Sequence, residues 1–398
     1  MNILQICTKV PFPPKDGGAA AVYALSKSFA ALGHHVDILA INPAKHFVSS
    51  NQIEHLPFTV YPVAVNTNVT IAGALFNLFF SSFPYHVQRF RSSVFETKLT
   101  DILSSNTYDV IQIEGIYLCY CIPLIRKYSK AKISLRAHNV EHSLWQDIAK
   151  HEKRFLIRQY LKIQTERLKK FELNQLHHTD VVVAITEADA TVFKTSKPLM
   201  NIKIIPFGVD PIDKKINPPT IIHSMFYIGA LDWLPNQEAL EWFLAKVWPK
   251  ILILFPSFEF YIAGRNAPNR LVDYLKTLCQ VFYCGEVESS SEFMELHDMM
   301  VVPLFSGSGM RVKIIEAMNN GKLIIASDKA CEGIPVQNNK HLRIASRVDE
   351  FVAAIEMSVK QPETNYNLLT EAKKLITENF NTLALASDLL NFYHQELP

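Results

Sequence analysis

Glycine is scarce in this sequence, with 13 glycines among 398 residues beside 21 prolines. This is about half of the ~7% glycine share of average proteins, which excludes collagen-like, flexible and glycine-rich low-complexity chains. A strong charge imbalance is also missing, because 40 lysines and arginines stand against 38 aspartates and glutamates. We therefore expect no dedicated nucleic-acid binder. Hydrophobic residues at 48% and charged residues at 20% instead predict sizeable cores and exclude global disorder.

Two further absences concern location and redox state. The sequence opens on a strand-like stretch, without the basic region, apolar region and cleavage site of a signal peptide, so we expect a cytoplasmic protein. The six cysteines form no Cys-x-x-Cys pair. This spacing predicts free, buried thiols rather than a disulfide framework.

The order of apolar runs predicts two parallel α/β domains. Short β-branched runs alternate with longer helical patterns, and the gaps leave room for crossover helices. The expected strands of the first half are 2–7, 36–41, 58–64, 109–113, 132–136 and 180–185. Those of the second half are 202–207, 225–228, 258–263, 281–284, 299–305 and 323–327.

A polar, proline-rich stretch at 206–219 separates the halves and is typical of a linker. We expect one domain at 1–208 and another at 209–382, and an amphipathic helix within 383–398 that can pack back on the first domain or on the second. Ten of the 13 glycines follow expected strands, and strand carboxyl ends form the ligand side of doubly wound sheets. This placement favours a ligand in a shared interdomain cleft, although tight turns alone explain part of it.

The most informative segment is 299–321, which predicts a strand, a Gly-Ser-Gly turn at 307–309 and a helix. A glycine turn at a helix start offers unpaired backbone N–H groups and the positive end of the helix dipole, which together bind anions. Arg311 and Lys313 add two cations in the first turn, where they disfavour the helix unless an anion binds. The alternative is an ordinary surface ion pair between Lys313 and Glu316.

A second glycine turn, Gly17-Gly18, follows the first expected strand and opens a helix. Two glycines let a phosphate approach the backbone closely. The segment does not match G-x-G-x-x-G, and the sequence has no Walker A motif, so a nicotinamide site and a P-loop ATPase are disfavoured.

His138 follows the fifth expected strand, four residues before His142 with Glu141 between them. A zinc site of the H-E-x-x-H kind needs the glutamate beside the first histidine on a helix, so we expect no metal here. A histidine at a strand end is suited to hydrogen-bond a sugar or phosphate oxygen. The alternative is a loop histidine whose hydrogen bonds are all made within the protein.

Two segments suggest contact with a membrane. Residues 70–85 are apolar but too short to span a bilayer, and residues 150–175 interleave eight lysines and arginines with apolar side chains. Together they could rest on an anionic membrane surface. The alternative is a long helix with a solvated charged face.

In order and spacing, these segments resemble the group 1 glycosyltransferases, the retaining family four. The matching segments are Gly17-Gly18, His138, 184–187, 206–210, 229–236, 263–265, 284–286 and 307–317. The resemblance implies the GT-B fold, in which two Rossmann-like, doubly wound parallel-sheet domains face each other across a cleft. The two glycine turns would then face each other across a diphosphate.

The resemblance also implies the roles of individual residues. Glu316 matches the second glutamate of the family's E-x7-E motif, which holds the ribose hydroxyls, whereas Ser308 replaces the first. The family's usual arginine and lysine after the first strand of the second domain are missing, so Arg311 and Lys313 become the expected diphosphate ligands. The expected catalytic residues are His138, Arg311, Lys313 and Glu316, and the expected donor-binding residues are Gly17, Gly18, Arg265, Gly285, Glu286, Gly307, Ser308, Gly309 and Met310.

The implied activity is sugar transfer from a nucleoside diphosphate sugar to a glycan or lipid-linked acceptor. The resemblance implies retention of configuration, no metal and no other cofactor, and a role in cell-surface polysaccharide synthesis in the cytoplasm or at the inner face of the membrane. Two alternatives are a catalytically silent nucleotide-sugar binding module, suggested by Ser308, and a nucleotide-sugar epimerase of GT-B shape.

Overall fold

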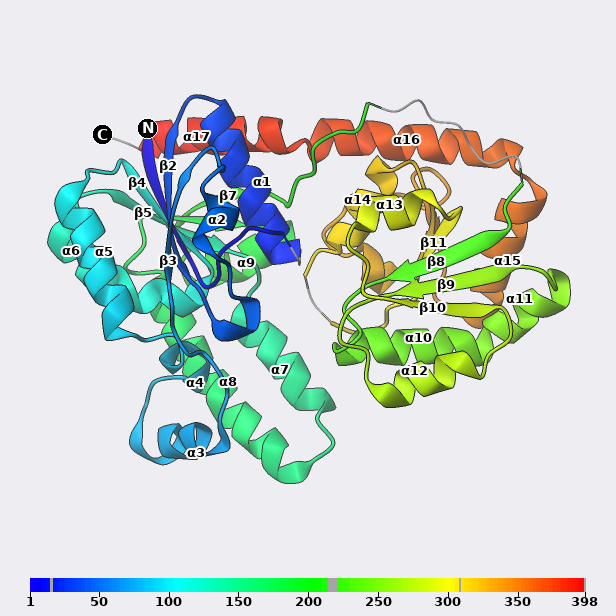
Figure 1. Ribbon diagram of the computed structural model, residues 1–398, viewed down its shortest axis with the longest axis horizontal. Helices are drawn as coiled ribbons and strands as arrows, with labels where there is room; N and C mark the ends of the chain where they lie inside the picture. The colour runs from blue at the N-terminus through cyan, green and yellow to red at the C-terminus, as the bar shows by residue number, and fades with distance from the viewer. Residues whose placement is uncertain (15–16, 214–220, 308, 397–398) are drawn as a thin grey trace. The chain divides into compact units, whose positions relative to one another are not determined.

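The structure, a computed structural model, describes residues 1–14, 17–213, 221–307 and 309–396. The chain forms two compact units, one of Met1–Gly208 with Thr382–Pro398 and the other of Val209–Asn381. Each unit is built on a parallel sheet with helices packed against it (Figure 1). The predicted class of two parallel-sheet α/β domains is confirmed.

The first sheet has seven strands in the order β3-β2-β1-β4-β5-β6-β7. They are β1 (Asn2–Cys7), β2 (His35–Ile41), β3 (Thr59–Val63), β4 (Val110–Glu114), β5 (Lys132–Ala137), β6 (Val181–Ala184) and β7 (Asn201–Ile204). The strand predicted at 202–207 does not belong with the second half, because β7 pairs in parallel with β6 and forms an edge of this sheet.

Side chains of the first sheet contribute to two hydrophobic cores, because successive side chains of a strand point to opposite faces of the sheet. Leu4 and Ile6 of β1 point into one core, whereas Ile3 and Cys7 point into the other. Burial on both faces explains why the strands are apolar along their whole length, as in β6.

Helices of the first unit cover both cores. They are α1 (Gly17–Ala31), α2 (Ser50–Ile53), α3 (Ile71–Phe80), α4 (Tyr85–Gln88), α5 (Ser93–Ser105), α6 (Ile122–Tyr128), α7 (Glu141–His151), α8 (Phe155–Gln175), α9 (Glu187–Ser196) and α17 (Thr382–Glu396), with short 3-10 turns η1 (Ala44–His46) and η2 (Ile116–Cys121). The final helix, α17, packs on this unit beside α1 (Figure 1). Its buried residues Ala386, Leu389 and Leu390 join the core that α1 covers.

The second sheet has the strand order β10-β9-β8-β11-β12-β13. Its strands are β8 (Ser224–Ile228), β9 (Glu259–Ala263), β10 (Val281–Gly285), β11 (Met299–Val302), β12 (Leu323–Ala326) and β13 (Arg343–Ile344). Its helices are α10 (Leu234–Lys246), α11 (Trp248–Leu254), α12 (Asn269–Lys276), α13 (Ser290–Glu295), α14 (Val312–Asn319), α15 (Val348–Lys360) and α16 (Glu363–Asn379), with a 3-10 turn η3 (Asp328–Cys331). The sequence did not predict β13, which has only two residues.

The burial of the cysteines and the length of the apolar helices can be compared with the expectations from the sequence. Four of the six free cysteines are buried, but Cys279 and Cys284 are exposed. The prediction of buried thiols was wrong for these two because they lie just before and within β10, an edge strand. None of the helices in the described ranges is long and apolar enough to cross a membrane.

Candidate functional site

Each sheet has one point where the strand order reverses. In the first unit β1 lies between β2 and β4, and in the second β8 lies between β9 and β11. Ligands of open α/β sheets bind beyond the carboxyl ends of the strands at such a point. The predicted turn at Gly17-Gly18 follows β1, and the predicted turn at 307–309 follows β11. Both glycine turns therefore lie at the switch point of their own sheet.

In the second unit, Gly307 allows a close approach between the turn and a tryptophan. Its φ is +96°, and a Cβ at this position would lie 2.5 Å from the Trp233 ring. Any side chain at 307 would therefore collide with Trp233 and strain the backbone. Trp233 immediately precedes α10, which follows β8, so the two strands of the switch point supply the two sides of this contact.

Arg311 is held between the turn and the same tryptophan. Its guanidinium carbon lies 5.1 Å from the centroid of the Trp233 ring, and Nη1 donates a hydrogen bond of 2.9 Å to the Gly309 carbonyl. Burial lowers the pKa of Arg311, against an opposing effect of Glu332. The cation is thus fixed directly before α14, one position ahead of the first helical turn in which the sequence placed it. Trp233 was missed, because nothing in its local sequence shows that its ring reaches this turn.

Lys313 and Glu316 form the ion pair that the sequence offered as the alternative. Nζ of Lys313 lies 2.7 Å from Oε2 of Glu316, and both side chains are partly exposed. The same Oε2 accepts a long hydrogen bond of 3.5 Å from Ser290 Oγ, on α13. Such a half-exposed pair is worth little by itself. Lys313 can therefore exchange Glu316 for a phosphate at small cost.

The remaining predicted residues of this unit lie at the ends of neighbouring strands. Arg265 follows β9, Gly285 ends β10 and the exposed Glu286 follows it. Their loops are joined by backbone hydrogen bonds, from Gly264 to the Gly285 carbonyl at 2.8 Å and from Leu231 to the Arg265 carbonyl at 3.0 Å. A Cβ at Gly264 would lie 2.0 Å from the Gly229 carbonyl oxygen. The loop after β8 can therefore approach position 264 this closely only because that residue is glycine.

The turn after β11 also contains Ser308 and Gly309, and Met310 follows it. Gly309 has a φ of +87°, and Met310 is buried. Ser308 lies outside the described residues.

In the first unit, His138 meets a buried carboxylate that the sequence did not reveal. Its Nε2 lies 2.6 Å from Oε2 of Glu114, which ends β4, while His138 follows β5. The His138 side chain is 20% exposed and that of Glu114 only 2%. Within the described residues, Nδ1 of His138 has no hydrogen-bond partner. The ring can thus be fixed by Glu114 and still offer its second nitrogen to a ligand.

Several groups keep Glu114 ionised. Burial alone would raise its pKa, but the charge of Arg136 and hydrogen bonds from His138 and Gln112 hold the pKa below its ordinary value. Arg136 Nη1 lies 3.5 Å from Glu114 Oε2, and Gln5 donates a 3.3 Å hydrogen bond to Oε1. A negative charge in the sheet interior is tolerated because these partners surround it.

The polar network continues from Glu114 to the final helix. The Tyr393 hydroxyl on α17 donates a 2.6 Å hydrogen bond to Gln112 Oε1 and lies 2.8 Å from Ser134 Oγ. Gln112 in turn donates to Glu114. Helix α17 is thereby connected, through buried side chains, to the carboxylate that orients His138.

The second histidine of the H-x-x-x-H pattern points to another partner. His142 Nδ1 lies 2.6 Å from Glu172 Oε2, and both oxygens of Glu172 accept backbone N–H groups at the start of α7. His138 and His142 therefore serve different carboxylates. Across the described ranges, no group of three His, Cys, Asp or Glu side chains is arranged to hold a metal ion.

Glu141 is the other unusual carboxyl of this region. Burial raises its pKa to about 7, with a contribution from the nearby Glu172 and an opposing hydrogen bond from Tyr117. The Tyr117 hydroxyl donates to Oε2 at 2.6 Å and accepts from Trp145 Nε1 at 3.2 Å.

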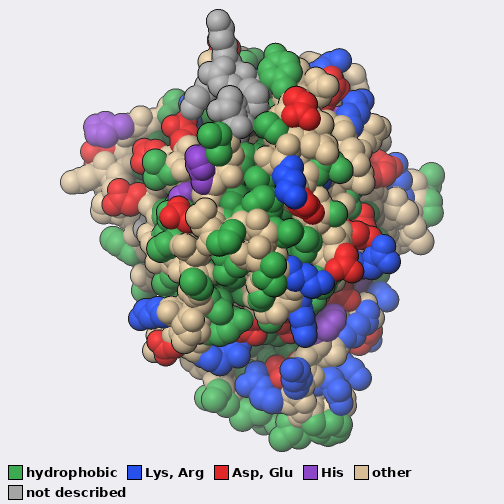
Figure 2. Space-filling view, turned by 90° about the vertical axis from the view of Figure 1, so that its right-hand side faces the viewer, with side chains coloured by type: hydrophobic (Ala, Val, Ile, Leu, Met, Phe, Trp, Pro, Cys, Tyr) green, Lys and Arg blue, Asp and Glu red, His purple; other side chains and the backbone are tan. Residues whose placement is uncertain are grey.

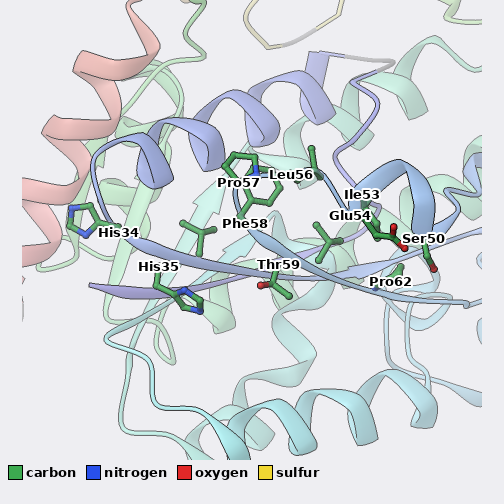
Figure 3. A pocket seen from close by; sticks show the side chains of 12 residues that line it. His34, His35, Ser50, Ile53, Glu54, Leu56, Pro57, Phe58, Thr59 and Pro62 are labelled. Atoms are coloured by element: carbon green, nitrogen blue, oxygen red, sulfur yellow. The ribbon is translucent and has the colours of Figure 1, made fainter.

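A hollow of about 620 Å³ in the first unit contains none of the predicted site residues. It runs beside β3, with Thr59 and Pro62 on the strand, Ser50 and Glu54 on one side, and His34 and His35 at the other end (Figure 3). Because it lies away from the switch point, we assign the site to the strand ends and not to this hollow.

Gly17 and Gly18 are the first two residues of α1 and are partly buried. The residues just before them, 15 and 16, lie outside the described part of the chain. The prediction that this turn faces 307–309 across a diphosphate stays a prediction.

Comparison with known proteins identifies the family. Residues 15–212 match the family described as Glycosyltransferase Family 4, and residues 223–361 match the family described as Glycosyl transferases group 1. A relative from Klebsiella pneumoniae, described as an uncharacterized 44.6 kDa protein in the cps region, is 22% identical over 98% of both chains.

Solved structures show the same fold. Sucrose-phosphate synthase from Thermosynechococcus elongatus is 17% identical, with a TM-score of 0.70 over 99% of each chain. TarM from S. aureus, solved as a variant with UDP, α-GlcNAc-glycerol and fondaparinux, is 12% identical, with a TM-score of 0.68 over 99% of this chain and 100% of that one. The two family matches extend over both units of the structure, and the chain therefore belongs to the group 1 glycosyltransferases of family four, with the GT-B fold.

Proposed function

We propose that this glycosyltransferase moves a sugar from a nucleoside diphosphate sugar to a glycan or lipid-linked acceptor. The observation that carries the donor assignment is the pair of cations at the start of α14, where Arg311 precedes the helix and Lys313 is its second residue. Backbone N–H groups and the positive dipole end of the helix add to their attraction for phosphate. The UDP bound to TarM supports this assignment.

The same groups would assist the reaction. Departure of the nucleoside diphosphate places negative charge on its phosphate oxygens. Cations and N–H groups that are in place once the donor is bound stabilise that charge without further reorganisation. Arg311 is already held by Trp233 and the Gly309 carbonyl. Lys313 would leave Glu316 for the diphosphate, freeing the Glu316 carboxylate to accept hydrogen bonds from the ribose hydroxyls.

Other predicted residues would place the rest of the donor. We assign His138 to the sugar, through Nδ1, with Glu114 holding Nε2. Gly285 and Glu286 would lie near the base, and Gly17 and Gly18 against the diphosphate. We propose a metal-independent reaction that retains the anomeric configuration, and we assign no protein side chain as general base.

We place the reaction in the cytoplasm, with a peripheral contact to the inner face of the membrane. This location gives access to a lipid-linked acceptor, and the relative encoded in a cps region supports a role in cell-surface polysaccharide synthesis. The exposed apolar side chains of α3 support the membrane contact.

Ser308 supports a second candidate, a nucleotide-sugar binding module without turnover, because it stands where the family has the first glutamate of its motif. Incubation with UDP-, GDP- and ADP-sugars and a lipid extract, followed by mass spectrometry, separates the candidates. Release of a nucleoside diphosphate with a glycosylated product supports transfer. A bound donor that is never consumed favours the module, and an altered sugar still attached to its nucleotide favours the epimerase.

A further inference from the structure

Helix α3 is folded with its apolar side chains toward solvent. Ile71 is 82% exposed, Phe79 73% and Phe80 75%, whereas Asn77, the polar side chain of the same helix, is completely buried. Helices on the surface of a protein in water ordinarily show the reverse arrangement. The exposed large apolar residues of α3 and of the residues just before it are Val69, Ile71, Leu75, Phe76, Phe79 and Phe80.

The orientation is fixed by hydrogen bonds to α8. Gln164 Nε2 donates a 2.8 Å hydrogen bond to Oδ1 of Asn77, and Arg167 donates to the carbonyls of Asn77 at 3.1 Å and Leu78 at 2.9 Å. Asn77 Nδ2 donates to the Phe83 carbonyl at 2.9 Å. Because the polar side of α3 is used in these contacts, rotating the helix to bury its phenylalanines would break them.

A hollow of about 770 Å³ opens where α3 meets α8. Phe79, Phe80, Phe83 and Phe171 give it aromatic walls, and Arg167 and Lys170 supply cations. Aromatic walls beside two cations suit a ligand with a phosphate group and an apolar chain.

Basic side chains accompany the apolar surface. Lys153, Lys162, Lys169 and Lys170 are exposed, and none of them forms an ion pair with a described residue. Phe155 and Leu156, in the first turn of α8, are also exposed, at 60% and 79%. At the lower end of the molecule, where α3 and the start of α8 lie in Figure 1, Figure 2 shows hydrophobic side chains beside a concentration of lysines and arginines.

The charge decides which occupant fits this surface. A two-fold contact with a second copy of the chain would bring together two copies of the same lysine-rich surface, with no acidic surface opposite either one. An anionic bilayer offers an apolar interior for the phenylalanines and phosphate groups for the lysines.

We propose that α3 and α8 form a docking surface for a bilayer that contains anionic phospholipids. The apolar side chains of α3 enter the boundary between headgroups and acyl chains, and a lipid phosphate lies in the hollow against Arg167 and Lys170. This inference rests on the proposed function, since it brings the enzyme to the layer that would hold a lipid-linked acceptor.

Flotation of the full chain with vesicles tests the proposal. One vesicle sample is phosphatidylcholine alone, and the other contains about one third phosphatidylglycerol. We expect binding to the anionic vesicles, weaker binding at high salt, and a loss of at least about tenfold for Phe79→Ser with Phe80→Ser. Replacing Lys162 and Lys170 by glutamine should weaken binding about fivefold for each lysine.

The control is Phe47→Ser, because Phe47 is also exposed, at 65%, but lies outside α3 and α8. It should bind vesicles like the wild type. Thermal melting confirms that each variant is folded. Equal binding of the α3 variants and the wild type, or no binding of the wild type to either vesicle, overturns the proposal, as does a dimer in gel filtration that the same phenylalanine changes dissociate.

Binding of nucleoside diphosphates, measured on the same samples without vesicles, keeps this proposal separate from the proposed function. Vesicle binding without nucleotide binding contradicts the donor assignment but still supports the docking surface. Nucleotide binding without vesicle binding contradicts the docking surface alone.

Discussion

Nε2 of His138 lies 2.6 Å from Oε2 of Glu114, so the end of β5 is joined to the end of β4 by a hydrogen bond to a buried carboxylate. The ionised carboxylate accepts a hydrogen bond from Nε2–H, which leaves Nδ1 as the nitrogen available for a substrate oxygen. A buried glutamate thus sets the orientation of the residue that we assign to the donor sugar.

Glu114→Gln should lower both activity and stability. The glutamine keeps the shape but removes the charge, so His138 loses its fixed orientation and Arg136 loses its buried counter-charge. We expect a decrease of kcat of at least about tenfold and a loss of roughly 3 kcal/mol in the free energy of unfolding. Steady-state kinetics and urea unfolding measure the two effects. A variant with wild-type values of both would show that the pair has neither role.

Glu141 should make stability depend on pH between its ordinary pKa and about 7. In that interval the folded protein holds the proton while the unfolded chain has released it, so stability falls as pH rises and then levels off. The total effect is roughly 3 kcal/mol, at ~1.4 kcal/mol for each pKa unit.

Thermal melting of Glu141→Gln against the wild type, from pH 5 to pH 8, checks this sign. The glutamine cannot ionise, so its melting temperature should fall less over this range. Parallel curves for the two proteins would contradict the raised pKa.

Gly307→Ala should weaken diphosphate binding and destabilise the second unit. The new methyl group would meet the Trp233 ring, which supports Arg311, and the φ of +96° would be strained. We expect a loss of roughly 2 kcal/mol in stability. Gly33→Ala is the matched control, because Gly33 has a φ of +82° with nothing within 4 Å of an added Cβ. If Gly307→Ala and Gly33→Ala have the same diphosphate affinity and the same melting temperature, the contact with Trp233 has no importance for the site.

Tyr393→Phe tests whether α17 supports the network around Glu114. The change removes one hydroxyl that contacts Gln112 and Ser134, at an expected cost of about 1–2 kcal/mol in unfolding free energy. Tyr366→Phe, on an exposed tyrosine of α16, should cost almost nothing. Urea unfolding compares the two, and equal stabilities would mean that the link through α17 contributes nothing.

The sequence predicts those parts of the fold that depend on local patterns. Strands such as β6 are recognisable because burial on both faces makes the whole run apolar. The two-residue β13 carries no such pattern. Strand β7 was grouped with the wrong half because its pairing with β6 depends on the crossover helix α9, which packs against both strands.

At the candidate site, the order of residues is enough to place the cations and glycines near the start of α14, since a helix start after a glycine turn is a local feature. Their role in donor binding stays a prediction. Glu114 and Trp233 were missed because their contacts join segments that are distant in the sequence. Residues 70–85 were identified as apolar, but the buried Asn77 that turns α3 outward depends on Gln164 and Arg167 of α8.

We assign the diphosphate of a nucleotide-sugar donor to Arg311 and Lys313. Isothermal titration calorimetry with UDP, GDP and ADP and their monophosphates, on the wild type, Arg311→Gln and Lys313→Gln, tests this claim. We predict that one diphosphate binds the wild type, and that each variant binds it at least about tenfold more weakly, since a charge-assisted hydrogen bond is worth about 1.5–3 kcal/mol. For the matching monophosphate, the loss of affinity in each variant should be much smaller. Unchanged diphosphate affinity in both variants, or no binding of any diphosphate to the wild type, would contradict the claim.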